Sequence, residues 1–308
     1  MTTVDTTPPG PPLAERLSSP RRGSVAADAP GAAGAPVAAR GAAARAADDD
    51  APFMPVVRRA PPVMVRGEGS FLWDEAGRRY LDFVQGWAVN SLGHAPPEVQ
   101  AALAEQSSLL LTPSPAFHNR PAIELVRLLA RLTGAAQVAL FNSGAEANET
   151  AIKICRKWGR RHKRGAFGIV STHGAFHGRT LAAMAVSGKP GWEQLFPPYP
   201  AGFSKVPFGD LEAMARAIDD STVALMVEPI QGEAGVVVPP PGYLRGLREL
   251  CDQRGLLLVL DEVQTGLGRT GRFLAQDHEG IRADVTTLGK GLGAAGVMQT
   301  LTAMPVAW

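Results

Sequence analysis

Short apolar runs alternate with amphipathic segments through most of the chain. Several runs are apolar at almost every position, which is typical of strands buried on both faces of a parallel sheet. Runs of this kind predict strands at 137–142 (QVALFN), 167–172 (FGIVST), 203–208, 223–229 (VALMVEP), 256–262 (LLLVLDE) and 284–290.

The segments between these runs have the spacing of helices. Helices are predicted at 145–161, 179–188, 211–220 and 243–255. Alternating strands and helices indicate an α/β fold with a mostly parallel sheet. In such open sheets, ligands bind at the carboxyl ends of the strands. Asn142, Ser143, Glu228, Asp261 and Lys290 all lie at or near these ends.

The region before the first of these strands has a different pattern. Residues 70–84 alternate apolar and polar positions around a turn at Asp74–Gly77, which predicts a β-hairpin. Residues 96–111 predict a helix with proline near its start. Residues 1–50 are rich in Ala, Pro and Gly and show no periodicity, so we expect a disordered extension there.

Composition narrows the function classes. The net charge is +2, with 31 Lys and Arg against 29 Asp and Glu, which argues against a nucleic-acid partner bound by bulk electrostatics. No apolar run reaches the roughly 20 residues of a membrane span, and the N-terminus lacks the apolar core of a secretory signal. Cys155 and Cys251 have no metal-binding or redox spacing, which favours reduced thiols in a cytoplasmic protein.

The stretch FNSGAEANET predicts the start of a helix. Ser143 followed by Glu146 forms a capping-box pattern. The pattern is explained by helix capping alone. Alternatively, the small turn of Ser143, Gly144 and Ala145 leaves backbone N–H groups free to hold a phosphate.

The loop THGAFHGRT, 172–180, carries several candidate side chains. Phe176 is suited to stacking on a planar ring, and Arg179 to gripping a carboxylate with two hydrogen bonds. The alternative is a loop with an incidental arginine. A metal site from His173 and His177 lacks a third ligand nearby, so no metal is expected.

Acids and a lysine follow later strands. Glu228 and Glu233 lie in VEPIQGEAG, Asp261 ends the strand LLLVLDE, and Lys290 lies among glycines in TLGKGLG. Glu228 and Glu233 can also be explained as ordinary surface acids, and Lys290 as an ordinary loop lysine. Glycines next to Lys290 would also let a ligand approach closely.

GLGRTG, 266–271, matches the GxGxxG fingerprint of dinucleotide-binding proteins. That fingerprint should follow its strand directly and open a helix. Here EVQT intervenes and the following residues are a poor helix. A nucleotide-binding oxidoreductase is therefore the weaker hypothesis.

A phosphate cradle, a stacking aromatic ring, a strand-end aspartate and a glycine-flanked lysine together suit pyridoxal 5'-phosphate (PLP). The lysine would bind the cofactor aldehyde as a Schiff base. The aspartate would favour the protonated pyridine ring, because a negative charge stabilises a neighbouring cation. The protonated ring is the better electron sink.

These motifs resemble the class III PLP-dependent aminotransferases. NSGAEANETAIK, AFHGRT, VEPIQGEAGV, LVLDEVQTGLGRTG and TLGKGLG occur in that family's order over about residues 55–293. SGAEANE with FHGR looks most like the acetylornithine aminotransferase branch. The resemblance implies the PLP-dependent transferase fold (fold type I) with a mostly parallel seven-stranded sheet, and a homodimer.

The resemblance also implies roles for individual residues. Lys290 would hold PLP and then shuttle a proton, and Asp261 would bind the pyridine nitrogen. The remaining cofactor-binding residues would be Ser143, Gly144 and Ala145 on the phosphate, Phe176 and Gln264 on the ring, and His177 and Glu228 in support. Substrate-binding residues would be Arg179 on the α-carboxylate, Glu233 as an acid that pairs with a later arginine, and Trp87 near the side-chain channel.

The end of the chain departs from the family. After LGKGLG, the residues AAGVMQTLTAMPVAW do not match. We expect residues 51–110 to be the N-terminal segment of the small domain, 111–293 an incomplete PLP-binding large domain, and 294–308 an aberrant tail. The sheet is expected to lack its last strand, and the C-terminal small domain to be absent. We therefore expect the truncated chain to be poorly folded or inactive.

The resemblance implies transamination of a terminal amine, with N-acetylornithine or a similar donor and 2-oxoglutarate as the acceptor. Other donors in the same class are ornithine, succinylornithine and 4-aminobutyrate. Trp87 puts a bulky indole where related enzymes tune specificity, although a core tryptophan explains it as well. A non-catalytic remnant is the alternative from another class.

Overall fold

The computed structural model describes residues 52–54, 56–57, 59–114 and 116–293, and the backbone of 299–303. The predicted disordered extension, 1–50, and the rest of the predicted tail, 294–298 and 304–308, lie outside the described residues. Contacts divide the chain between Pro52 and Phe53. All the elements that follow belong to the compact unit Phe53–Trp308.

A small antiparallel sheet contains the predicted hairpin. Its strands are β1 (Met64–Glu68), β2 (Phe71–Asp74) and β3 (Arg79–Leu81), with β2 in the centre. The hairpin β2–β3 is confirmed, whereas β1 was not predicted. Asp74 fixes the turn, because its carboxylate accepts hydrogen bonds from the Arg78 backbone N–H at 2.9 Å and from the Tyr80 hydroxyl at 2.8 Å.

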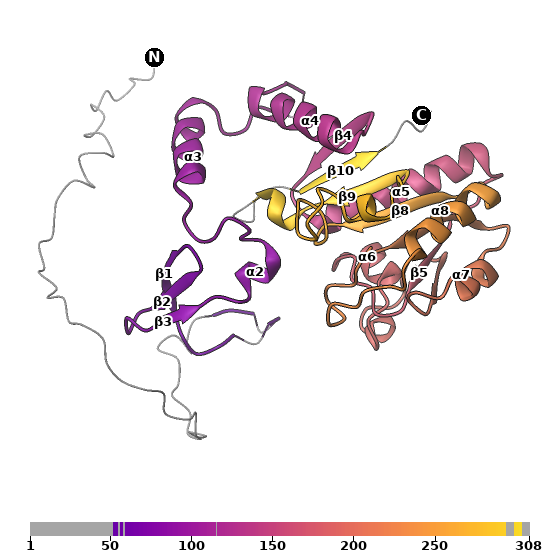
Figure 1. Cartoon of the computed structure of the whole chain (residues 1–308), viewed down its shortest axis with the longest axis horizontal. Helices are drawn as coiled ribbons and strands as arrows, with labels where there is room; N and C mark the ends of the chain where they lie inside the picture. The colour runs from indigo at the N-terminus through magenta and orange to yellow at the C-terminus, as the bar shows by residue number, and fades with distance from the viewer. Residues whose placement is uncertain (1–51, 55, 58, 115, 294–298, 304–308) are drawn as a thin grey trace, which may run out of the picture. The chain divides into compact units, whose positions relative to one another are not determined.

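The larger sheet has seven strands in the order β4-β10-β9-β8-β7-β5-β6 (Figure 1). The strands from β5 to β9 pair in parallel, as the uniformly apolar runs predict. All the strands predicted for this sheet are confirmed within two residues at each end. Their bounds are β4 Gln137–Phe141, β5 Gly168–Thr172, β6 Phe203–Val206, β7 Thr222–Val227, β8 Leu257–Glu262 and β9 Val285–Leu288.

The expectation that the sheet lacks its last strand was wrong. The strand β10 (Gln299–Ala303) lies between β4 and β9 and pairs antiparallel with both. Without it, two facing strands would each leave a row of backbone N–H and C=O groups unpaired. Main-chain pairing makes few demands on side chains, and the two threonines of QTLTA favour an extended backbone. The residues of the predicted tail can therefore still fill the position.

The helices agree with the predicted pattern except for two. The helix α4 (Arg120–Thr133) was not predicted, although Asn119 caps it by accepting a hydrogen bond from Ala122 N–H at 2.9 Å. The short α2 (Gln85–Ala88) is a turn with left-handed residues inside it. The others are α3 Pro97–Leu109, α5 Gly144–His162, α6 Leu181–Val186, α7 Leu211–Ala217 and α8 Tyr243–Arg254, with 3₁₀ turns at Trp192–Gln194, Ala275–His278 and Lys290–Gly293. No helix of the described residues is long and apolar enough to cross a membrane.

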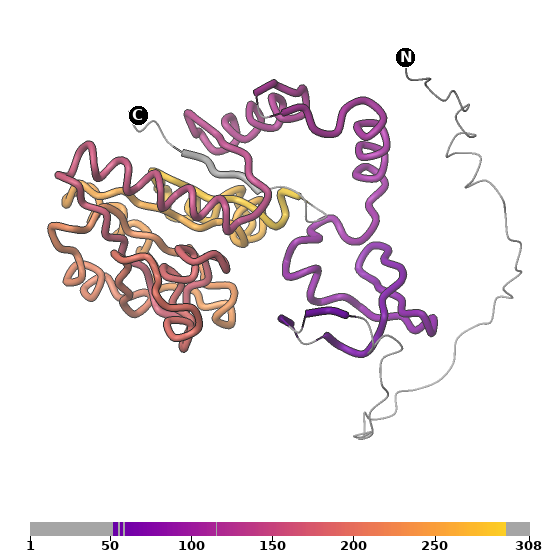
Figure 2. Tube along the Cα trace, turned by 180° about the vertical axis from the view of Figure 1, so that it is seen from behind, coloured from indigo at the N-terminus to yellow at the C-terminus, as the bar shows by residue number. Residues whose placement is uncertain are grey.

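Helices cover both faces of the large sheet. Alternate residues of β8 pack on opposite sides: Leu257 and Val259 join the cluster formed with α5, and Leu258 and Leu260 join the cluster formed with α7 and α8. Figure 2 shows α5 lying lengthwise along the sheet, with its axis aligned with the strands. The residue that follows Val259 by two positions, Asp261, must therefore point to the α5 face.

The core at β8 should dominate the stability of this unit. Leu258 is fully buried between the sheet and α8. Leu258→Ala should lower the free energy of unfolding by about 2–5 kcal/mol, because it removes apolar contacts and leaves a cavity. Urea unfolding measures this, with Leu103→Ala as the control, since Leu103 on α3 is 59% exposed and should change the value by less than about 0.5 kcal/mol. Equal losses for the two variants would contradict this packing.

Candidate active site

A cavity of about 380 Å³ lies at the carboxyl ends of the large sheet's strands. Its lining brings together all the site residues that the sequence predicts, from segments more than 200 residues apart. The predicted residues are Trp87, Ser143, Gly144, Ala145, Phe176, His177, Arg179, Glu228, Glu233, Asp261, Gln264 and Lys290. The lining also includes residues that were not predicted, namely Gly86, Val89, Asn148, Gly178 and Val263.

Strand periodicity explains why three polar residues meet on the same face. On β7, Ala224 and Met226 pack toward α5, and on β9 so does Val285. Because side chains alternate between faces, Glu228, Asp261 and Thr287 continue this face beyond the apolar positions. The strands thus bury their apolar residues and deliver polar ones where the sheet ends.

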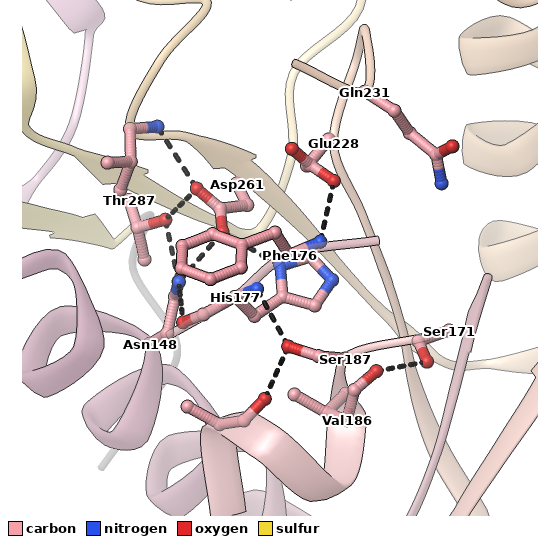
Figure 3. Close-up of polar contacts among 12 residues, drawn as sticks. Asn148, Ser171, Phe176, His177, Val186, Ser187, Glu228, Gln231, Asp261 and Thr287 are labelled. Carbon is pink, nitrogen blue, oxygen red and sulfur yellow. Dashed lines mark hydrogen bonds and ion pairs between the residues drawn. The ribbon is translucent and has the colours of Figure 1, made fainter. Parts of the chain in front are cut away.

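Asp261 is the centre of a buried hydrogen-bond network (Figure 3). Its Oδ2 accepts from Asn148 Nδ2 at 2.7 Å and lies 2.8 Å from His177 Nδ1. Thr287 Oγ1 lies 3.3 Å from Asp261 Oδ1 and donates to Asn148 Oδ1 at 2.9 Å. A buried carboxylate is costly unless it is paired and hydrogen-bonded. This network therefore satisfies the oxygens of the buried Asp261 side chain and fixes its orientation.

His177 is completely buried beside Asp261. Burial alone would lower the pKa of His177, but the hydrogen bond and charge of Asp261, with the charge of Glu228, outweigh it and raise the pKa. The backbone N–H of His177 donates to Ser187 Oγ at 2.9 Å, which anchors the loop to α6. Among the described residues, none is a hydrogen-bond partner of His177 Nε2. The imidazole thus contributes to the site by holding the Asp261 carboxylate in place.

Glu228 is a buried acid on the same face. Its Oε2 accepts a hydrogen bond from the Phe176 backbone N–H at 3.0 Å, which ties the loop 172–180 to the end of β7 (Figure 3). Burial raises the pKa of Glu228 to about 7, with the charge of Asp261 adding to the rise and that of His177 opposing it. Glu228 therefore changes charge near neutral pH.

This raised pKa predicts a pH-dependent stability. The carboxyl of Glu228 binds its proton more tightly in the folded protein, at about 7 against 4.5 for its ordinary pKa. Its stabilising effect is fully present below about pH 4.5 and is lost as the pH rises through about 7. Glu228→Gln keeps an acceptor for Phe176 N–H and does not titrate.

Between pH 4.5 and 8, the free energy of unfolding of the wild type should fall by on the order of 3 kcal/mol relative to Glu228→Gln. Urea unfolding of both proteins at several pH values measures the difference. Parallel curves for the two proteins would contradict the raised pKa of Glu228.

The N-terminus of α5 also lines the cavity. Ser143 Oγ accepts from Glu146 N–H at 3.2 Å, as the capping pattern predicts, while the Glu146 carboxylate accepts from Asn142 N–H at 2.8 Å. The first amides of a helix have no partner within the helix. Those of Gly144 and Ala145 are therefore available to an anion at a helix end that favours negative charge.

Two close approaches depend on glycine. Gly178 has φ +131°, and a Cβ there would lie 2.8 Å from Ala145 Cβ, so the loop reaches the start of α5 only without a side chain. At Gly232, a Cβ would lie 1.6 Å from Gln264 Oε1. Gly232 thus gives the Gln264 side chain the space it occupies at the cavity wall.

Lys290 enters the cavity from the turn that follows β9. Burial lowers the pKa of its amine, against the opposing charges of Glu233, Asp261 and Glu228. Its Nζ lies 4.0 Å from Glu233 Oε1. A lowered pKa leaves a larger share of the amine neutral at neutral pH, which is the form that attacks a carbonyl carbon.

Aromatic side chains surround the Arg179 guanidinium. It lies 5.5 Å from the centroid of the Trp87 ring and 6.0 Å from that of Phe176. Both rings line the cavity, and Trp87 is half exposed. This indole is therefore at the cavity wall, which excludes the alternative of a core tryptophan.

The weaker sequence hypotheses are not supported by the geometry. GLGRTG forms turns and opens no helix. Instead, Arg269 donates to Ala88 O at 3.3 Å and to Ser91 Oγ at 3.2 Å, which joins this loop to the segment carrying Trp87. The described residues contain no cluster of three or more His, Cys, Asp or Glu side chains that could hold a metal ion.

PLP fits the residues present. It needs an anion site, an anionic partner for its ring nitrogen, and an amine to bind its aldehyde. The start of α5, the buried carboxylate of Asp261 and the amine of Lys290 all line one cavity of a size common for small ligands. The fold and the cavity thus define an α/β protein whose cavity contains the groups that a phosphorylated, ring-containing aldehyde cofactor needs.

The chain belongs to the class-III aminotransferase family. The family model matches residues 54–304, and so reaches past Gly293, where we expected the resemblance to end. The family is PLP-dependent, and its fold is the expected fold-type I architecture.

Curated relatives are similar over most of this chain. "Acetylornithine aminotransferase 2" of Bordetella bronchiseptica is 52% identical over 241 residues, which are 78% of this chain and 61% of the relative. "Ornithine aminotransferase" of Bordetella pertussis is 50% identical over 233 residues, 75% of this chain and 57% of the relative. The chain thus spans about three fifths of the length of these relatives.

A solved ornithine aminotransferase from Toxoplasma gondii has the same fold. It is 38% identical to this chain and superposes with a TM-score of 0.81. The match covers 84% of this chain and 62% of the Toxoplasma gondii chain. That structure is described as having partial occupancy of PLP at the protein active site.

Proposed function

We propose that this protein is a PLP-dependent aminotransferase that moves the terminal amine of N-acetylornithine, or a similar donor, to 2-oxoglutarate. The observation that carries the proposal is the meeting of the Lys290 amine, the buried Asp261 carboxylate and the N-terminus of α5 in one cavity. These groups match the amine, the ring-nitrogen partner and the phosphate site that PLP needs.

The residues that would hold the cofactor come from four segments. The amides of Gly144 and Ala145 with the Ser143 hydroxyl would bind the phosphate. Phe176 would cover the ring, with Gln264 on the ring oxygen and Asp261 on the ring nitrogen. When bound, PLP would supply an aldehyde that captures the donor amine and a ring that takes up the electron pair left when the neighbouring carbon loses its proton.

The chain's own residues supply proton transfer and orientation. The Lys290 amine, with its lowered pKa, would accept and return the proton of the carbon next to the reacting amine. Asp261 would keep the facing ring nitrogen protonated, with Asn148 and His177 holding it in place. Arg179 would bind the donor's α-carboxylate beside Trp87.

Ornithine is the second candidate donor. The observation in its favour is the 50% identity to a protein named ornithine aminotransferase, close to the 52% for one named acetylornithine aminotransferase 2. A panel of N-acetylornithine, succinylornithine, ornithine and 4-aminobutyrate with 2-oxoglutarate distinguishes them through the rate of glutamate formation. N-acetylornithine should give the highest kcat/KM, and no glutamate from any of the four would refute the proposed function.

We also infer that the active form is a cytoplasmic homodimer. Apolar side chains are exposed along the N-terminal part of the unit, including Leu109, Leu111 and Phe117 at 72%, 78% and 70%. An exposed apolar group of this kind is typical of a surface that a partner covers. Both cysteines are free and buried, as in a reducing compartment. Analytical ultracentrifugation tests the dimer.

A further inference from the structure

A second lysine, Lys189, lies behind the cavity wall on a rigid backbone. The preceding Gly188 donates its N–H to Ala175 O at 2.9 Å and accepts from Gly174 N–H at 2.9 Å. A Cβ at Gly188 would lie 2.2 Å from Thr172 O, so only glycine fits this crossing. The backbone that carries Lys189 is therefore fixed against the loop that carries Phe176.

Three contacts hold the Lys189 ammonium. Its Nζ lies 3.4 Å from Glu233 Oε2, 4.8 Å from the centroid of the Phe176 ring and 5.6 Å from that of Trp192. The two rings meet edge to face, with centroids 5.8 Å apart. Aromatic faces attract cations. These contacts thus hold the Lys189 ammonium next to Glu233 Oε2.

Glu233 is shared between the reacting lysine and this second one. Its Oε1 faces Lys290 Nζ at 4.0 Å, and its Oε2 faces Lys189. The side chains of Lys189 and Glu233 are 28% and 24% exposed, so the pair is less screened than a surface ion pair. Glu233 lines the cavity, and Lys189 offsets its negative charge from behind.

We propose that Lys189 is a specificity-determining residue: by neutralising Glu233, it favours donors whose α-amine is acylated over donors with a free α-ammonium. This inference rests on the proposed function and deepens it. Without Lys189, the Oε2 side of the Glu233 carboxylate at the cavity wall would attract the α-ammonium of ornithine, whereas the neutral amide of N-acetylornithine gains nothing from that charge. Lys189 removes this advantage and repels a second cation.

The test is the ratio of kcat/KM for N-acetylornithine to kcat/KM for ornithine. Lys189→Gln should lower the ratio about tenfold, mainly by improving KM for ornithine, and Lys189→Arg should restore it to within about twofold. Lys153→Gln, at an exposed position of α5 outside the cavity lining, is the matched control and should leave the ratio unchanged. In a Glu233→Gln background, Lys189→Gln should have no further effect, because the charge it offsets is absent.

Binding of unreactive probes separates this inference from the proposed function. N-acetylnorvaline and norvaline lack the terminal amine, and calorimetry on the cofactor-free protein gives their Kd values. Lys189→Gln should shift the ratio of these values about tenfold toward norvaline. Wild-type protein that forms no glutamate from any of the four donors would refute the proposed function alone, and the calorimetry would still decide the role of Lys189. An unchanged Kd ratio, or binding of neither probe, would overturn the inference.

Discussion

Lys290→Ala should abolish amine transfer. The variant loses the only amine that the described cavity lining offers to the cofactor aldehyde and to the migrating proton. Loss of covalent capture together with loss of acid–base catalysis should lower the turnover rate by at least about 10⁴-fold. The rate of glutamate formation from the best donor measures the effect at saturating PLP.

The matched control is Lys153→Ala, which removes an exposed lysine from α5. It should retain the wild-type rate within about twofold. A Lys290→Ala protein with more than about one hundredth of the wild-type rate would contradict the role of Lys290. Far-UV circular dichroism of the three proteins establishes that the loss is not one of folding.

Asp261→Asn should cause the second-largest loss. The substitution keeps the size of the side chain and removes the charge that would stabilise a protonated ring nitrogen. Removing a preorganised charge from a buried site should lower kcat on the order of 10³-fold, with a smaller effect on KM. Asp220→Asn, at an exposed position after α7, is the control.

A second readout separates this electrostatic role from a structural one. The charge of Asp261 helps to raise the pKa of His177, so Asp261→Asn should lower that pKa, as NMR titration of the imidazole can measure. An Asp261→Asn protein with wild-type kcat would contradict the account. So would an unchanged pKa of His177.

Much of the site could be predicted because strand pattern and chemistry coincide. The run LLLVLDE predicts both a buried strand and a carboxylate at its carboxyl end, and β8 delivers Asp261 to the cavity. Parallel strands bring such ends to one edge, so residues far apart in the chain can be assigned to one site. The capping pattern at Ser143 likewise fixes both the start of α5 and the position of its free amides.

Other features required the three-dimensional structure. Asn148 lies one turn into α5, and nothing in the sequence distinguishes it until Thr287 and Asp261 are found beside it. Lys189 follows a helix in an ordinary turn, and its pairing with Glu233 spans 44 residues. The strand β10 lies in the predicted tail, and its antiparallel pairing with β4 and β9 appears only in the folded sheet.

The helix α4 carries start and stop signals of its own in the sequence. The segment of α4 has a capping asparagine at 119, a proline at the second helical position and a glycine just past its end. These are the usual signals of helix start and stop. The helix α4 precedes β4, the first strand of the alternating pattern. The pattern that predicts the sheet therefore begins after this helix and does not include it.

The central claim is that Lys290 and the cavity around it form a PLP site. The most direct test mixes the purified 308-residue chain with PLP, records the visible absorption spectrum, fixes the product with borohydride and maps the labelled peptide. We expect a lysine-bound absorption band and a single labelled residue, Lys290. Absorption of the free aldehyde alone, or label scattered over many lysines, would contradict it.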